Sequence, residues 1–189
     1  MPRPPILKPV DFQAIFKSAA TYRQWLKAAE DARHVQIMEK LRKEHQLEPP
    51  VRARLESITR TVNVLVFAED WCGDVHRHVP VLEKMASFSR RVRTRYVTRE
   101  EQPEAFKRFL TNGGEAIPKF VFLNHKFTEC GNWGAMPEEC RRLISRGKAA
   151  GDVAGARKRI AGIYESDPNC ELTVREILEL LDIATCEVP

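Results

Sequence analysis

The sequence lacks any long hydrophobic run. The longest unbroken apolar stretch is 64–68, whereas a membrane-spanning helix needs about 20 such residues. The proline-rich, basic N-terminus also lacks the apolar segment and the small-residue cleavage site of a secretory signal. We therefore expect a cytoplasmic protein with no membrane partner.

Cysteine and glycine are both scarce. The 189 residues include five cysteines, an odd number at irregular spacing, and nine glycines. A cytoplasmic chain of this length buries enough surface to fold without disulfides, so we expect reduced thiols. With 43% hydrophobic residues, the composition is also unlike that of a disordered or collagen-like chain. A cysteine with a function should therefore act through its reactivity.

Positive charge is concentrated near the N-terminus. Residues 1–60 contain 12 Lys and Arg against 7 Asp and Glu, whereas residues 61–189 contain 19 of each. A basic helical arm can contact nucleic acid or an acidic partner. No aromatic-rich or DNA-reading motif accompanies this charge, so we interpret it as a solvated helix surface and do not expect nucleic acid to bind.

The apolar spacing of the first 60 residues is helical. We expect two helices over 11–46 and a short helix over 51–58, after a proline pair that interrupts the pattern. At the other end of the chain, residues 147–155 are a joint that precedes helices over 156–164 and 174–184.

The middle of the chain alternates between strand and helix patterns. Residues 61–68 are β-branched and almost continuously apolar, as in a strand buried on both faces. A helical stripe and a second strand follow, which predicts a parallel β-α-β unit with a right-handed crossover. We expect a further helix, a hairpin of two strands and a last helix. These predicted segments are 74–89, 92–98, 103–110, 119–123, 126–130 and 138–146.

Cys72 lies between the first strand and its helix, in the segment Glu-Asp-Trp-Cys-Gly-Asp-Val at 69–75. Unpaired N–H groups and the positive end of the helix dipole favour a thiolate there, and they lower the pKa of a cysteine. The carboxylates of Glu69, Asp70 and Asp74 act in the opposite direction. The sequence leaves the balance open.

Three features of the chain resemble the thioredoxin superfamily. Residues 71–73 read Trp-Cys-Gly, the start of the family's Trp-Cys-Gly-Pro-Cys motif. Pro80 falls where the family has a proline in its active-site helix, and Ile117-Pro118 resembles the cis-proline before the third core strand. The resemblance implies an α/β, thioredoxin-like fold, in which a central mixed sheet is flanked by helices.

The domain organisation follows from this resemblance. We expect a thioredoxin-like core over 61–146, with helical extensions over 1–60 and 147–189. Within the superfamily, the chain resembles a group of uncharacterised bacterial proteins with Glu-Asp-Trp-Cys-Gly-Asp-Xaa, then Val-Pro, Ile-Pro and Trp-Gly. The last of these pairs is Trp133-Gly134.

The sequence departs from the family motif at the positions whose residues complete thiol–disulfide exchange. Val75 replaces the second cysteine, Asp74 replaces the intervening proline, and Val66 replaces a buried aspartate. In ordinary exchange the first thiolate attacks a disulfide and the second cysteine resolves the mixed disulfide. Dithiol chemistry at this motif is therefore excluded.

Three alternatives remain for Cys72. It can act as a monothiol that is released by glutathione or another small thiol, as in monothiol glutaredoxin-like proteins. A distant cysteine can resolve it, and Cys130 is the better candidate because the last core strand lies near the active site in the resembled fold. Cys140 is the weaker candidate. Alternatively, the fold is a non-catalytic scaffold that binds a partner.

The other predicted site residues surround this cysteine. By resemblance, Trp71, Gly73, Ile117 and Pro118 form the surface that binds a protein or small-thiol disulfide substrate. The spacing Cys-x-x-x-His-x-His after Cys72 is compatible with a metal site, but the chain supplies no regular fourth ligand. We therefore expect no metal and no cofactor. The sequence does not determine the oligomeric state.

Overall fold

The computed structural model describes residues 9–186 and contains a four-stranded mixed sheet with the order β2-β1-β3-β4. Strand β1 pairs in parallel with β2 and antiparallel with β3, and β3 pairs antiparallel with β4. Every residue of β1 is buried, as its apolar sequence predicts. The strands are β1 (Val62–Phe67), β2 (Val92–Val97), β3 (Lys119–Leu123) and β4 (Glu129–Gly134).

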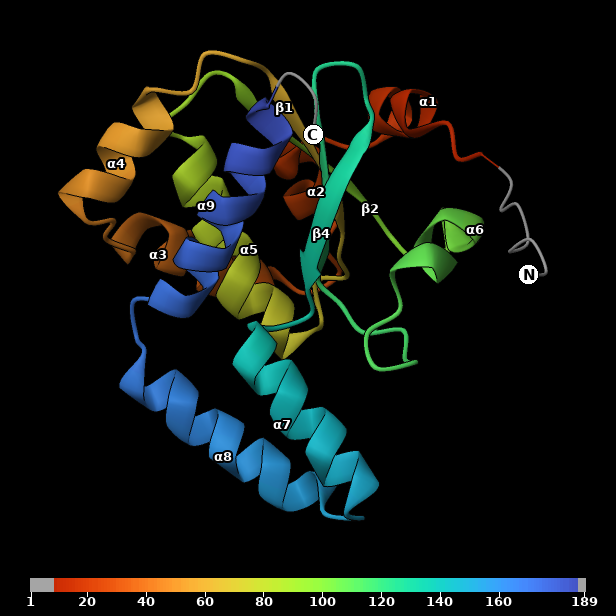
Figure 1. Ribbon diagram of the computed structural model, residues 1–189, viewed down its shortest axis with the longest axis vertical. Helices are drawn as coiled ribbons and strands as arrows, with labels where there is room; N and C mark the ends of the chain where they lie inside the picture. Colours follow the sequence, from red (N-terminus) through yellow and green to blue (C-terminus); the bar gives the residue numbers. More distant parts are fainter. Residues whose placement is uncertain (1–8, 187–189) are drawn as a thin grey trace, which may run out of the picture.

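Helices connect and cover these strands (Figure 1). The predicted β-α-β-α-β-β-α order and the α/β, thioredoxin-like fold class are both confirmed. A short 3-10 turn, η1 (Lys107–Phe109), follows α6 and replaces the end of the predicted helix 103–110. The helices are α1 (Phe12–Ser18), α2 (Tyr22–Lys27), α3 (Ala32–Glu44), α4 (Pro49–Glu56), α5 (Gly73–Ala86), α6 (Pro103–Phe106), α7 (Glu138–Ala149), α8 (Val153–Ser166) and α9 (Glu171–Thr185).

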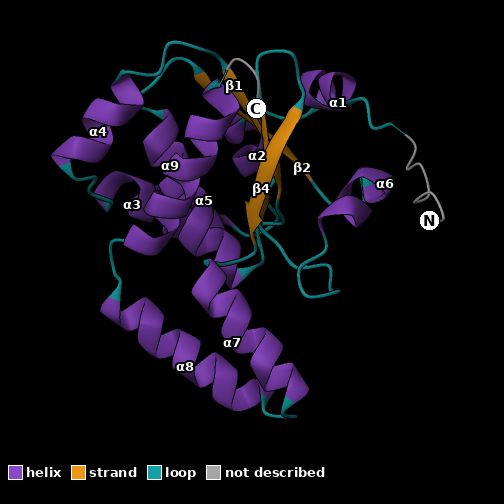
Figure 2. Cartoon of the chain, viewed as in Figure 1, coloured by secondary structure: helices purple, strands orange, loops and turns teal. Residues whose placement is uncertain are grey.

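The two faces of the sheet have different coverings. On one face, Phe67 packs against the rings of Phe106 and Phe109, so α6 and η1 lie there. On the other face, the rings of Phe120 and Trp133 stack and contact α5, and α9 packs against β3 and β4. Figure 2 shows α7 and α8 side by side beyond one end of the sheet. Of the described helices, none is both long and apolar enough to span a membrane.

Besides the helix 103–110 and the joint 147–155, which α7 and α8 shorten to 150–152, two predicted segments differ from the structure. The prediction of two helices over 11–46 is wrong, because the chain forms three. Ala20 leaves the helical path and its backbone exchanges hydrogen bonds of 3.0 and 2.8 Å with Tyr96 of β2. Asp31 then caps α3 by accepting the N–H of Arg33 at 2.8 Å.

The second strand of the hairpin begins later than its predicted range, 126–130. The side chain of Asn124 accepts the N–H groups of Lys126 and Thr128 at 2.8 and 3.0 Å, so the turn extends to Thr128. This Asx-type turn moves the strand to Glu129–Gly134. As a result, Gly134 pairs with Lys119 instead of lying in a following loop.

The pairing of the strands defines two ends of the sheet. At one end of the sheet, β1, β2 and β4 finish and β3 starts. We call this the Cys72 end, because Cys72 follows β1 there. The opposite end holds the hairpin turn, and we call it the hairpin end. The terminal residues are Phe67, Val97, Lys119 and Gly134 at the Cys72 end, and Val62, Val92, Leu123 and Glu129 at the hairpin end.

Candidate thiol site

Cys72 occupies the N-cap position of α5, one short loop after the buried strand β1. Its backbone is extended, with φ −85° and ψ 126°, and its side chain is half-buried. The thiol lies 3.6 Å from the carbonyl oxygen of Ile117, to which it donates. The sulfur is therefore between the start of a 14-residue helix and the segment that precedes β3.

The surroundings of Cys72 raise the pKa of its thiol. Burial is the largest cause, because removing the thiolate from water disfavours the charged form. The backbone N–H groups of Val75 and Asp74 act against this and favour the thiolate, as expected at a helix N-terminus. The carboxylates of Asp74 and Glu69 raise the pKa further. The balance that the sequence leaves open is therefore in favour of the protonated thiol.

The segment facing Cys72 contains the predicted cis peptide bond, between Ile117 and Pro118. Both residues are buried, and Gly134 of β4 packs against Pro118. A Cβ atom at Gly134 would be 2.0 Å from the carbonyl oxygen of Pro118, and the φ of Gly134 is +120°. Only glycine is compatible with this position. The Trp-Gly pair thus supports the backbone beside the thiol.

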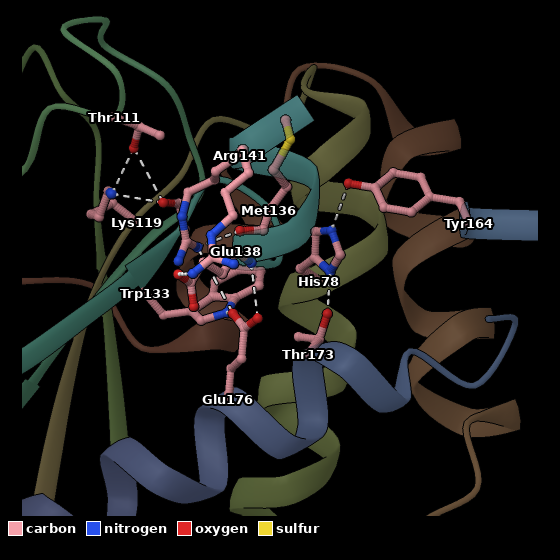
Figure 3. Close-up of polar contacts among 12 residues, drawn as sticks. His78, Thr111, Lys119, Trp133, Met136, Glu138, Arg141, Tyr164, Thr173 and Glu176 are labelled. Carbon is pink, nitrogen blue, oxygen red and sulfur yellow. Dashed lines mark hydrogen bonds and ion pairs between the residues drawn. The ribbon is translucent and has the colours of Figure 1, made fainter. Parts of the chain in front are cut away.

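A buried lysine holds the same corner (Figure 3). The Nζ of Lys119 donates to the carbonyl oxygen of Gly134 at 2.8 Å and to Thr111 Oγ1 at 2.7 Å. Thr111 Oγ1 donates to the same carbonyl oxygen at 3.1 Å. Burial, with a smaller effect of Arg141, lowers the pKa of Lys119 to about 8. The Lys119 ammonium, the Thr111 hydroxyl and the Gly134 carbonyl come from separate segments, and their hydrogen bonds fix the backbone next to Pro118.

Arg99 joins the two loops that flank the thiol. Its Nε donates to both carboxylate oxygens of Glu69, at 3.2 and 3.1 Å, and its Nη1 donates to the carbonyl oxygen of Glu115 at 2.9 Å. The guanidinium also lies 5.9 Å from the ring centre of Trp71. Arg99 is not among the site residues that the sequence predicts. The signal was its place just after the second strand, which ends at the same edge as Cys72.

The N-terminal extension reaches the same loop through a histidine. His34 of α3 contacts Asp70, with 3.2 Å between Nδ1 and Oδ2, and its ring centre is 4.7 Å from that of His76. A ring nitrogen of His76 hydrogen-bonds the carbonyl oxygen of Asp70. Among the described residues, no group of three or more His, Cys, Asp and Glu is arranged to hold a metal ion. These contacts therefore fix the loop.

The C-terminal extension is tied to the first turns of α5 by a chain of hydrogen bonds. Tyr164 Oη of α8 donates to Asp74 Oδ1 at 2.9 Å and lies 3.2 Å from His78 Nε2. His78 Nδ1 is 3.0 Å from Thr173 Oγ1 of α9 (Figure 3). Burial lowers the pKa of His78 to about 3, so its ring is neutral at neutral pH. Burial also raises the pKa of Asp74, although the bond from Tyr164 acts against this.

A second link anchors α9 to β4. The indole N–H of Trp133 donates to Glu176 Oε2 at 2.7 Å, and the backbone N–H of Glu138 donates to Oε1 at 2.8 Å. Arg141 lies 3.8 Å from the same carboxylate. The carboxylate of Glu176 thereby fixes Trp133 (Figure 3), and the next residue, Gly134, packs against Pro118.

Comparison with known proteins identifies this arrangement. The family model described as "Thioredoxin" matches residues 20–150, which is more than half of the chain. The chain belongs to the thioredoxin family. No curated protein matches it.

Two solved structures share this thioredoxin fold. A protein of unknown function from Pseudomonas aeruginosa is 18% identical with a TM-score of 0.68, and an HIV epitope-scaffold protein is 14% identical with a TM-score of 0.70. Each match covers 92% of this chain and 98% of the other chain. The similarity therefore extends beyond the core to the helical extensions, and at these identities it concerns the fold alone.

The structure does not bring Cys130 to Cys72. In the thioredoxin fold of this chain, the Cys72 end of β4 is Gly134, and Cys130 lies four residues earlier, toward the hairpin end. At about 3.3 Å per residue, this is about 13 Å along the strand, whereas a disulfide needs Cα atoms within about 7 Å. The predicted strand 126–130 placed Cys130 at the end that leads into the loop near the active site. The strand runs Glu129–Gly134 instead, so Cys130 lies near its start, toward the hairpin end.

The remaining predicted site residues differ in exposure. Trp71 is 60% exposed and Gly73 is also exposed, so both are accessible from solvent beside the thiol. Ile117 is only 5% exposed, and Pro118 is buried. The accessible surface around Cys72 is therefore formed mainly by the loop and helix start that precede and follow it.

Proposed function

We propose that the protein carries out thiol–disulfide exchange through the single thiol of Cys72. The observation that supports this most is the position of the sulfur, half-buried at the N-terminus of α5 and 3.6 Å from the carbonyl oxygen of Ile117. The backbone beside Pro118 then offers hydrogen-bonding groups to an extended disulfide substrate. Trp71, exposed beside the thiol, provides an apolar contact.

The exchange proceeds in two steps. The thiolate of Cys72 attacks one sulfur of a substrate disulfide, forms a mixed disulfide with it and expels the other sulfur as a thiolate. Val75 is buried where a resolving cysteine would stand, and Cys130 is too far away. The thiolate of an external small thiol, such as glutathione, therefore attacks the substrate sulfur of the mixed disulfide. This forms a new disulfide and releases Cys72 as a thiolate.

The raised pKa of Cys72 gives this site a distinctive pH dependence. Burial and the carboxylates of Asp74 and Glu69 hold the sulfur as a thiol at neutral pH. Because the thiolate is the nucleophile, the rate should rise with pH up to and beyond the ordinary range for cysteine, about 8.5. A plateau near neutral pH would contradict this.

Insulin reduction in the presence of glutathione tests the proposal. The wild type should exceed the Cys72→Ser variant, which should fall to the background rate of glutathione alone. Cys130→Ser is the matched control, because that cysteine is also half-buried and should retain full activity. Equal rates for the wild type and Cys72→Ser would refute the exchange reaction.

A second candidate function is partner binding without turnover. It is favoured by the raised pKa of Cys72 together with the exposed Trp71, over which the Arg99 guanidinium lies. A partner that is captured by Cys72→Ser but lost with Trp71→Ala would support this function. A partner that is held only by wild type and is released by a reductant would support thiol exchange instead.

A further inference from the structure

A pocket of about 330 Å³ lies on the outer side of α5, away from the Ile117 segment that faces the thiol. Its walls are the last turn of α3, the side of α5 over 73–81, and the loop over 168–170 between α8 and α9. The core contributes one wall, and the N-terminal and C-terminal extensions contribute the other two. This volume is in the range of small-molecule sites.

Two polar side chains of this pocket have unused hydrogen-bonding atoms. His45, at the end of α3, is only 9% exposed, and its Nε2 atom has no partner among the described residues. The Nε–H of Arg77 on α5 is also buried and has no partner there. Leaving such a buried group without a hydrogen-bond partner is energetically unfavourable. Two unpaired groups in one pocket therefore indicate a ligand with hydrogen-bond acceptors.

The charge of the pocket specifies the ligand further. The Nη2 of Arg77 donates only to backbone carbonyl oxygens, those of Tyr164 and Asp167, and its guanidinium lies 4.3 Å from the ring centre of Tyr164. No described carboxylate forms an ion pair with it at 4.0 Å or less. Glu44 also lines the pocket, but it is exposed and solvent screens its charge. The guanidinium thus favours an anion.

The remaining walls favour an apolar body on that anion. Leu41, Pro80 and Val81 supply apolar parts of the pocket lining. Burial lowers the pKa of His45; Lys84 and Arg77 act in the same direction, and the carboxylate of Asp167 acts against it. A neutral imidazole presents one N–H donor and one acceptor, which suits a carboxyl group without requiring a second charge.

We propose that this pocket binds a small organic acid, with its carboxylate between Arg77 Nε and His45 Nε2 and its short apolar body against Leu41, Pro80 and Val81. Both nitrogen atoms are shielded from solvent. The ligand therefore reaches them only when side chains at the rim of the pocket change rotamer, a change that is common on binding. Leu41 is 40% exposed at that rim. Gly73 lines both this pocket and the surface beside Cys72, but binding of the acid does not require the thiol.

Titration with hexanoate tests this site, using isothermal calorimetry and the backbone amide signals of Gly73 and Asn169, which line it. Hexanoate should bind saturably in the millimolar range, whereas hexan-1-ol and inorganic phosphate should not. If hexan-1-ol binds as tightly as hexanoate, the site is only an apolar crevice. If phosphate binds as tightly as hexanoate, the site takes an adventitious ion only. Either result, or no saturable binding of hexanoate, overturns the proposal.

Variants locate the binding on the structure. Arg77→Gln should weaken hexanoate binding at least tenfold, but Arg77 also contacts the end of α8. Leu41→Trp therefore serves as a second variant that fills the rim without touching α8. Ile37→Trp, one turn earlier on α3 and similarly exposed at 43%, is its matched control. Unchanged binding in Leu41→Trp would overturn the location, and Cys72→Ser should bind hexanoate as the wild type does.

Discussion

The two ends of the sheet are built by different means. At the hairpin end, the turn is closed by its own residues, since Asn124 accepts the N–H groups of Lys126 and Thr128. At the Cys72 end, by contrast, each loop is held by a side chain that is distant in sequence. Arg99 holds Glu69, and Lys119 holds Gly134. The difference shows that the position of the thiol depends on tertiary contacts, whereas the opposite turn depends on local sequence.

The largest effect is expected at Gly134. In Gly134→Ala, the added Cβ would meet the carbonyl oxygen of Pro118 at 2.0 Å, and the φ of +120° is unfavourable for alanine. We expect the free energy of unfolding to fall by about 3 kcal/mol or more in urea denaturation.

The control for this substitution is a glycine in open space. A Cβ at Gly162, within α8, meets nothing within 4 Å. Because alanine is the better helix former, Gly162→Ala should raise the free energy of unfolding by about 1 kcal/mol. Similar losses of unfolding free energy in both variants would mean that the loss in Gly134→Ala does not come from the close contact at the Cys72 end.

The next effect concerns Arg99. In Arg99→Met, the carboxylate of Glu69 loses the hydrogen bonds of the guanidinium, and bonds to charged groups contribute about 1.5–3 kcal/mol. Solvent screens part of this, so we expect a loss of about 2 kcal/mol in urea denaturation. The unneutralised Glu69 should also raise the pKa of Cys72 further and slow its alkylation by iodoacetamide at neutral pH.

An ion pair away from the site provides the comparison. Arg54 contacts Asp182 at 2.6 Å, and both side chains are about half exposed. Arg54→Met should change stability by less than about 1 kcal/mol and leave the alkylation rate of Cys72 unchanged. Equal slowing of alkylation in the two variants would show that Arg99 does not act through the thiol loop.

A third effect appears on acidification. The pKa of His78 is about 3 in the folded protein and about 6.5 when unfolded, so folding favours its neutral form. Its stabilising contribution is complete above pH 6.5 and is lost as the pH falls from 6.5 toward 3. Between pH 7 and 5 the loss is about 2 kcal/mol by linkage. His78→Gln should remove this part of the pH dependence in urea denaturation.

The exposed His125, in the hairpin turn, is the matched position for His78. His125→Gln should leave the pH dependence of unfolding as it is in the wild type. An unaltered slope in His78→Gln would indicate that other groups produce the acid sensitivity.

The smallest effect is on reactivity alone. Asp74→Asn keeps an acceptor for Tyr164 and removes a negative charge that raises the pKa of Cys72. Alkylation of Cys72 by iodoacetamide at neutral pH should become severalfold faster. Cys130, toward the hairpin end, should react at its wild-type rate, which mass spectrometry of the two peptides can measure. Acceleration at both cysteines would indicate general loosening instead of an electrostatic effect.

Local patterns were enough to predict most of the fold. The β-α-β unit was predicted from the apolar run of β1, the helical stripe of α5 and the pattern of β2. Such patterns are visible in sequence because alternation and helical periodicity are properties of nearby residues. The break at Ala20 and the shifted start of β4 were missed. Ala20 leaves the helix to pair with Tyr96, 76 positions away, and no local pattern records such a contact.

For the site, the sequence determined which atom is presented. A cysteine that follows a buried strand by one short loop and starts a helix must lie at the helix N-terminus, and the absence of a second cysteine at Val75 excludes dithiol chemistry there. Only the tertiary structure decided the rest: that Cys130 is remote, that burial outweighs the N–H groups at the thiol, and that Arg99 and Lys119 hold its loops. Burial and charge act through space, between residues whose separation along the chain does not fix their distance.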